Sequence, residues 1–323
     1  MKNNLFICST VAFASLVTTG CIRTLEVTLP DSTQQIVVNT YLTDDEILPI
    51  DSTRPSGYNR PHVQLSQTAP ALDGRISPLN DKTASVQITE NGNVVATGLY
   101  TPYSQFTPQN IDKYELTGFK PQPYKTYTIR VKHKDYPETT STETAPAPMQ
   151  PFTAVLTIDS LSSGNGNFKQ YVRKTTFTLQ DDVNTADFYE IRVGENTVHD
   201  NGSGQIDTVV SQNRIMRVSQ GMTVLQSSQS ALVSDNTFNG QKISFFIDAS
   251  SNSGSPTEVS APFIRIYKIT KSRFVYLKSV QQQQFSGNGS NPFAEASFVY
   301  SNMSNGFGIF SFGFGRTVTP ERR

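Results

Sequence analysis

Two groups of neighbouring acids are the residues of this 323-residue chain whose types and spacing could do chemistry. Asp44-Asp45-Glu46 and Asp181-Asp182 could each bind a calcium ion or act as a pair of catalytic carboxylates. Adjacent residues on a strand point to opposite faces, so neighbouring carboxylates are poorly placed to share one ligand. We therefore interpret both groups as solvated turn acids.

Histidine and cysteine offer little further chemistry. His62, His133 and His199 are scattered singly and have no partner motif, so we expect ordinary surface or half-buried side chains. The only cysteines are Cys8 and Cys21, which leaves the rest of the sequence without a disulfide framework or a thiolate metal site.

The sequence contains no G-x-S-x-G elbow, no H-E-x-x-H and no P-loop. We expect no catalytic residues, no metal and no cofactor, and therefore a protein that is not an enzyme. A hydrolase with an unrecognised site is the least favoured class, because it needs a cleft with converging carboxylates or a metal.

Composition restricts the class of protein in a similar way. Lys+Arg and Asp+Glu are both 27, so the formal net charge is zero, which argues against a nucleic-acid partner. Aromatic residues make up 10% and charged residues only 17%, and the sequence is rich in Ser, Thr, Asn and Gln. This composition is typical of an all-β protein outside the cytoplasm.

The N-terminus predicts export. Lys2 precedes the apolar stretch 5–17, which suits a signal peptide and is too short to cross a bilayer as a helix. The following LVTTGC, residues 16–21, resembles the lipobox of bacterial lipoproteins, which implies cleavage after residue 20 and lipidation of Cys21. The alternative is an ordinary secretory signal that is cut nearby, with Cys21 incidental.

The remaining pattern predicts a mainly β fold in two parts. Residues 21–33 are expected to form a tether, and 34–145 an immunoglobulin- or fibronectin-like β-sandwich with a hairpin turn at Asn91-Gly92. The Pro-rich stretch 144–152 marks a boundary, after which 146–323 form a second β-rich domain. Apolar spacing favours one helix near 269–284, and the alternating Phe310, Phe312 and Phe314 are expected to face a core.

One group of aromatic residues is a candidate binding surface. Tyr100, Tyr103 and Phe106 lie in a Pro-containing loop, where exposed aromatics can stack on sugars or pack against a partner protein. The alternative, which we favour, is that they close one end of the sandwich, since most aromatic side chains contribute area to cores.

The C-terminal third carries a family resemblance. A DNTFNGQKISF stretch (235–245), the YLKSVQQQQF helix (276–285) and NPFAEASFVYSNMSNGFGIFSFGFG (291–315) resemble Bacteroidota outer-membrane lipoproteins catalogued as domain of unknown function 4249. An early strand, 36–44, after Leu29-Pro30 is similar as well. Within this set of motifs we expect Asn291, Pro292, Phe293, Ser301, Asn302 and Gly306 to be structural.

The resemblance implies a context rather than a reaction. It implies a protein anchored in the cell outer membrane by lipid, serving as an accessory or binding component beside a TonB-dependent transporter of a nutrient uptake system. The alternative is a surface lipoprotein with a structural or adhesive role.

Overall fold

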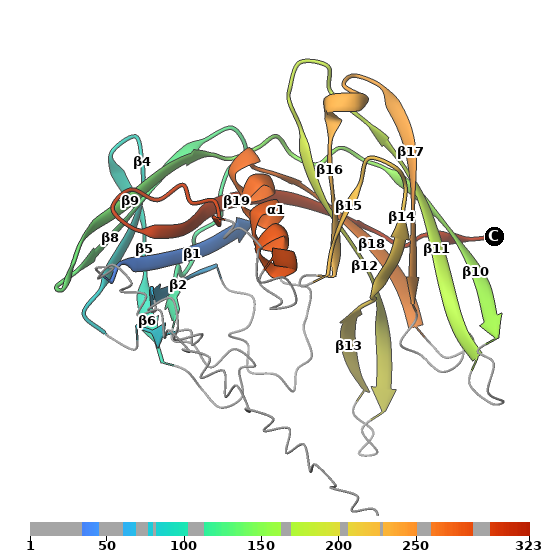
Figure 1. The fold of residues 1–323 in the computed structure, drawn as a ribbon, viewed down its shortest axis with the longest axis horizontal. Coiled ribbons are helices and arrows are strands. Elements are labelled where there is room, and N and C mark those ends of the chain that lie inside the picture. Colours follow the sequence, from blue (N-terminus) through green and yellow to red (C-terminus); the bar gives the residue numbers. More distant parts are fainter. Residues whose placement is uncertain are drawn as a thin grey trace, which may run out of the picture. The chain divides into compact units, whose positions relative to one another are not determined.

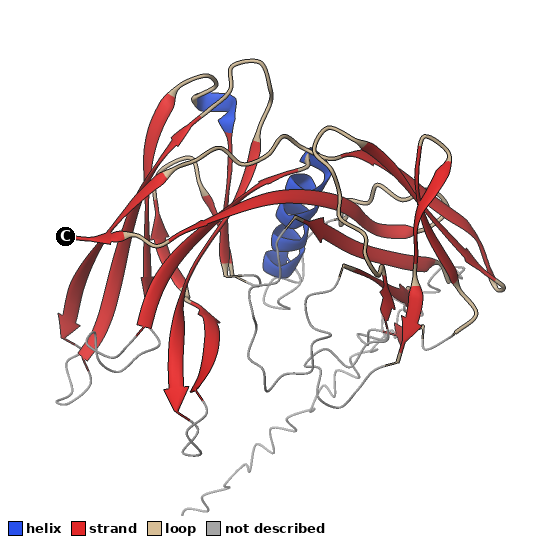
Figure 2. Cartoon of the chain, turned by 180° about the vertical axis from the view of Figure 1, so that it is seen from behind, coloured by secondary structure: helices blue, strands red, loops and turns tan. Residues whose placement is uncertain are grey.

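Alternating β-branched and aromatic residues build most of the described chain from strands. The computed structural model describes residues 34–44, 61–68, 77–79, 82–102, 113–162, 169–200, 206–226, 229–250, 260–286 and 298–323. All of these belong to one compact unit, Gln34–Arg323. A single α-helix stands among the strands of the described segments (Figure 2).

The largest sheet has 11 strands, in the order β15-β16-β12-β18-β19-β1-β2-β7-β6, with β13 paired to β12 and β3 to β2. Strands β1 and β19 pair in parallel, and its other strand pairs are antiparallel. In chain order the strands are β1 (Ile36–Thr43), β2 (His62–Gln67), β3 (Ser77–Pro78), β6 (Leu99–Thr101), β7 (Lys113–Glu115), β12 (Phe188–Asp200), β13 (Ile206–Gln212), β15 (Thr223–Leu225), β16 (Ser230–Ser234), β18 (Ser260–Ile269) and β19 (Phe307–Val318).

Two smaller sheets pack against this one. The first has the order β5-β4-β8-β9 and the second β14-β17-β11-β10-β20. Their strands are β4 (Ser85–Glu90), β5 (Asn93–Thr97), β8 (Thr126–His133), β9 (Tyr136–Thr144), β10 (Thr153–Ser162), β11 (Lys169–Gln180), β14 (Ile215–Val218), β17 (Lys242–Ser250) and β20 (Glu321–Arg322).

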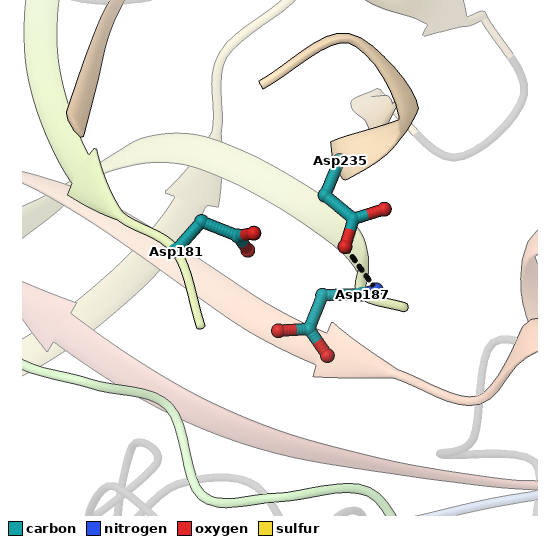
Figure 3. Close-up of side chains that lie close together, drawn as sticks. All are labelled: Asp181, Asp187 and Asp235. Carbon is teal, nitrogen blue, oxygen red and sulfur yellow. Dashed lines mark hydrogen bonds between the residues drawn. The ribbon is translucent and has the colours of Figure 1, made fainter. Parts of the chain in front are cut away.

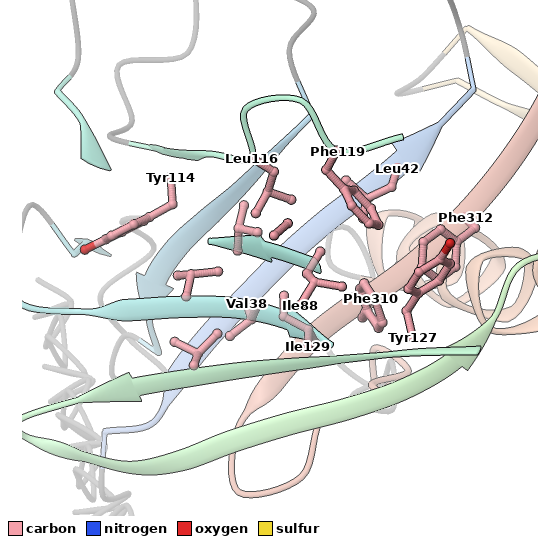
Figure 4. Packing of buried hydrophobic residues seen from close by; sticks show 14 of the residues in the cluster. Val38, Leu42, Ile88, Tyr114, Leu116, Phe119, Tyr127, Ile129, Phe310 and Phe312 are labelled. Carbon is pink, nitrogen blue, oxygen red and sulfur yellow. The ribbon is translucent and has the colours of Figure 1, made fainter. Parts of the chain in front are cut away.

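Each small sheet shares a hydrophobic core with the large one. The first core joins Ile88 and Ile129 of the four-stranded sheet to Val38 and Leu42 of β1 (Figure 4). The second core contains residues of β11 and β17 together with residues of β12 and β18. Facing sheets that bury alternate side chains between them form a sandwich, so the mainly β prediction is confirmed.

Strand β19 (red-brown in Figure 1) contributes to both cores. Phe310, Phe312 and Phe314 are buried in the first core, as their alternation predicts, and Val318 packs against the second. The predicted division of the chain at residues 145 and 146 stays a prediction. The first core, however, draws on the C-terminal strand as well as on residues 36–145.

Two local predictions are confirmed by the backbone. Asn91 and Gly92 both have positive φ, 50° and 82°, and join β4 to β5 in the predicted hairpin. The helix predicted near 269–284 is α1, which spans Lys271–Ser286. It begins later than predicted because β18 continues to Ile269. It packs on β19, β12 and β15 (Figure 1). Within the segments that the structure describes, no helix has the length and apolar character needed to span a membrane.

Candidate functional site

A groove of about 320 Å³ lies beside helix α1 and is the candidate functional site. It is lined by residues of β1, the start of β19, one side of α1 and the segment 298–301, which precedes β19. Strand β1 turns Val38 and Leu42 into the first core. The alternation of a strand therefore leaves Val37 and Asn39 on the opposite face, where they line the groove.

Aromatic side chains form the walls of this groove and remain in contact with solvent. Phe298 is 93% exposed and Phe307 45% exposed, and Tyr276 and Tyr300 line the same hollow. Isolated exposed apolar residues are ordinary, but several aromatics gathered around one hollow make it a candidate binding surface. The four aromatic residues come from α1, from segment 298–301 and from β19, so the tertiary fold brings them together.

Hydrogen bonds fix the aromatic segment against the helix. The Tyr300 backbone N–H donates to Ser279 Oγ at 2.9 Å, and the same hydroxyl donates to the Tyr276 carbonyl at 2.7 Å. The Ser279 hydroxyl therefore links Tyr276 of α1 to Tyr300 of segment 298–301, and both tyrosines line the groove. These two bonds hold segment 298–301 against α1 along the groove wall.

Asn302 clamps the other end of that segment. Its Nδ2 donates to the Phe310 carbonyl at 2.8 Å and to Glu143 Oε2 at 3.1 Å, while its Oδ1 accepts from the Phe310 N–H at 3.0 Å. Burial raises the pKa of the Glu143 carboxyl, and hydrogen bonds from Ser272 and Asn302 oppose that rise. The side chain of Asn302 thus ties the segment to β9 and β19, which is a structural role.

Glycine 308 brings β19 close enough to β1 to complete the groove floor. It has φ of +112°, and a Cβ built on it would lie 2.0 Å from the Val38 carbonyl oxygen. Gly306 is also crowded, because its Cβ would lie 2.8 Å from the Ile36 carbonyl oxygen. Only glycine accommodates such an approach between backbones.

A second cluster of possible chemical interest lies at the turn between β11 and β12. Asp181, Asp187 and Asp235 are all buried, and one carboxylate oxygen of each lies within 4.8 Å of the others (Figure 3). Asp235 belongs to the short 3-10 helix η1 (Asp235–Thr237), and its Oδ2 accepts the Asp187 backbone N–H at 2.6 Å. The expectation that Asp181 is a solvated turn acid is therefore wrong, since it is only 5% exposed.

Protein donors already satisfy these carboxylates. Tyr189 Oη donates to Asp181 Oδ1 at 2.7 Å, and the Gly240 N–H donates to Asp181 Oδ2 at 3.0 Å. Lys268 Nζ lies 2.5 Å from Asp187 Oδ2 and supplies a counter-charge to that acid. Burial raises the pKa of Asp235, and the charges of the other two acids add to that rise. We interpret the cluster as a structural anchor of η1 and of the β11–β12 turn.

A third cluster lies under the N-terminal end of α1. Glu190 of β12 is fully buried and binds two guanidinium groups. Arg192 donates to Oε1 from Nε at 2.9 Å and from Nη2 at 2.6 Å, and Arg273 of α1 donates from Nε to Oε2 at 2.9 Å. Burial raises the pKa of Glu190, but the two arginines outweigh this effect and lower it to about 2.

Two tyrosines complete this third cluster. The guanidinium of Arg273 lies 3.4 Å from the ring centroid of Tyr41, and Arg192 lies over the ring of Tyr267. Burial raises the pKa of Tyr41 well above its usual value. Gly313 leaves room for this ring, because a Cβ there would lie 2.2 Å from the Tyr41 hydroxyl. These contacts connect α1 to β1, β12 and β18, so they position the helix that walls the groove.

The residues selected from the sequence lie elsewhere. Tyr100 packs against the first core, with its ring edge-on to Tyr114 at 5.6 Å between centroids. Tyr103, Phe106 and Cys21 lie outside the described residues. His133 is buried and its ring packs against Tyr136 at 5.1 Å. The prediction from sequence therefore did not include the groove residues. One signal that could have pointed to them is Asn39, a polar residue on the same strand face as Val37 and Tyr41.

The fold defines a mainly β protein. In its described part, one α-helix packs on the largest sheet and an aromatic groove lies beside that helix. The model of the family described as Domain of unknown function (DUF4249) matches residues 22–314, and the chain belongs to this family. The membership of domain of unknown function 4249 that the C-terminal motifs indicate is thereby confirmed. A search of the curated proteins gives no match.

Proposed function

We propose that this protein is an outer-membrane lipoprotein that acts as a non-catalytic binding component beside a TonB-dependent transporter of a nutrient uptake system. The observation that carries the binding role is the groove with exposed aromatic walls beside α1. A hollow of this kind, with apolar walls and a few polar groups, is suited to hold a ligand.

The charged clusters favour binding over catalysis. A catalytic carboxylate must reach a substrate, whereas Glu190 is fully buried between two arginines and Asp187 is paired with Lys268. The groove itself is lined by apolar and neutral polar residues. Its chemistry therefore supports recognition of a ligand.

Membrane attachment is proposed through Cys21, at the end of LVTTGC. One acyl chain holds a protein only marginally at a membrane, while two or more hold it stably, at about 0.8 kcal/mol per buried CH₂. A diacylated thiol with an acylated amine at residue 21 would retain the chain at the outer membrane without any spanning helix.

Substitution Cys21→Ala is expected to release the protein from the envelope. We expect the wild type to fractionate with the outer membrane and to give an acylated N-terminal peptide by mass spectrometry. Cys8→Ala is the matched control, because Cys8 lies within the segment that is proposed to be removed, and it should leave fractionation unchanged. A Cys21→Ala protein that stays in the membrane, or a wild type without acyl groups, would contradict the anchor.

A further inference from the structure

The lining of the groove has a distinctive chemistry. Four aromatic residues surround it, namely Tyr276, Phe298, Tyr300 and Phe307. Four further lining residues have neutral side chains that can form hydrogen bonds, namely Asn39, Thr68, Gln283 and Ser301. The other described lining residues are Val37, Val299 and Gly308, so none of the lining residues that the structure describes carries a charge.

Such a lining selects against charged ligands. A charge that leaves water for this groove would find no counter-charge among the described lining residues, and an unpaired buried charge is costly. The phenols of Tyr276 and Tyr300 are neutral as well, since burial raises their pKa further above the ordinary value of 10.0. The occupant is therefore expected to be uncharged.

The polar lining residues indicate that the occupant also forms hydrogen bonds. Asn39 lines the groove from β1, on the strand face that also carries Val37. Its carboxamide, together with Thr68, Gln283 and Ser301, gives the lining neutral groups that suit a ligand able to form hydrogen bonds. A purely apolar occupant, such as an acyl chain, would form no hydrogen bonds with these residues.

We propose that the groove binds a neutral carbohydrate. Sugar rings have an apolar C–H face that can pack on Phe298, Tyr300 and Phe307, and hydroxyl groups that can bond Asn39, Gln283 and Ser301. The volume of about 320 Å³ is near the lower end for ligand pockets, which suits roughly one or two rings of a sugar chain. This inference rests on the proposed function, since it names the ligand class of the same groove.

The test uses the full-length protein in a polyoxyethylene detergent, which has no sugar headgroup to compete. The protein is screened on an array of neutral and acidic glycans, and the neutral disaccharide that corresponds to the strongest signal is titrated by calorimetry. Phe298→Ala is expected to weaken binding about tenfold, the equivalent of one aromatic contact. Because Phe298 is 93% exposed, its removal should leave the fold intact.

Tyr124→Ala is the matched control, because it removes an aromatic residue that is 67% exposed and does not line the groove. Asn39→Leu provides a second variant that keeps the size of the side chain but removes its carboxamide. Saturable binding of a neutral sugar that weakens in Phe298→Ala and Asn39→Leu, but not in Tyr124→Ala, would support the inference.

Three results would overturn it: no glycan bound, acidic glycans bound in preference to neutral ones, or binding that both groove variants retain. Failure here is distinguishable from failure of the proposed function. If sugar binding is absent while the acylated protein still associates with a transporter, only the carbohydrate inference falls. If sugar binding persists without acylation or a transporter, the uptake role falls and the ligand class stands.

Discussion

Substitution Glu190→Gln is expected to lower the free energy of unfolding by about 3–5 kcal/mol. Glu190 is fully buried and is the carboxylate that Arg192 and Arg273 share. The neutral amide would leave the buried guanidinium of Arg273 and the partly buried guanidinium of Arg192 without their counter-charge, which costs much more than an ordinary hydrogen bond. The midpoint of urea unfolding, measured at neutral pH, gives this loss directly.

Glu138→Gln is the matched control, because Glu138 also contacts two cations, Arg130 at 3.1 Å and Lys132 at 3.3 Å. Its side chain is 38% exposed, and we expect a loss below about 1 kcal/mol. Equal losses for the two variants would contradict the view that burial makes the Glu190 cluster important.

The same cluster gives a pH dependence of stability whose sign follows from the lowered pKa of Glu190. The folded protein holds this pKa at about 2, below the ordinary value of 4.5. The unfolded chain therefore binds the proton first as pH falls, so the stabilisation is complete above about pH 4.5 and is lost between that pH and about 2. Glu190→Gln should lack this component of acid denaturation.

Substitution Gly308→Ala is expected to cost about 3 kcal/mol or more. The φ of +112° alone costs an L-residue about 1–3 kcal/mol, and the new Cβ would lie 2.0 Å from the Val38 carbonyl oxygen. Relief of that clash requires β1 to move away from β19, which would loosen the first core and the groove floor. Thermal and urea unfolding of the purified variant provide the measurement.

Gly118→Ala separates the two causes, because Gly118 has φ of +74° but open space around its Cβ position. We expect this control to lose only about 1–2 kcal/mol. If Gly308→Ala were as mild as the control, the close approach of β1 and β19 at this position would be wrong.

Local chemistry made several parts of the fold predictable from sequence. Asn91-Gly92 predicts its hairpin because both residues tolerate positive φ. The period-two pattern of Phe310, Phe312 and Phe314 predicts a core face, and the spacing of apolar residues predicts α1. Each of these depends on neighbours within a few positions, so no tertiary information was needed.

Long-range contacts account for what the sequence did not reveal. The parallel pairing of Val38 with Gly308 joins residues that are far apart in the chain, and local periodicity contains no information about it. Asp181 was expected in solvent because its burial depends on Tyr189 and on the distant Gly240 N–H. The groove is likewise assembled from β1, α1 and segment 298–301, which no sequence window contains together.

The most direct test of the central claim is a mild-detergent pull-down of the full-length protein from its native envelope, with mass spectrometry of its partners. A binding lipoprotein of an uptake system should recover a TonB-dependent barrel transporter together with the acylated peptide that begins at Cys21. The Cys21→Ala protein, processed beside it, should recover much less transporter. Recovery of no barrel with the wild type would contradict the account, and self-association in its place would favour a structural or adhesive surface protein.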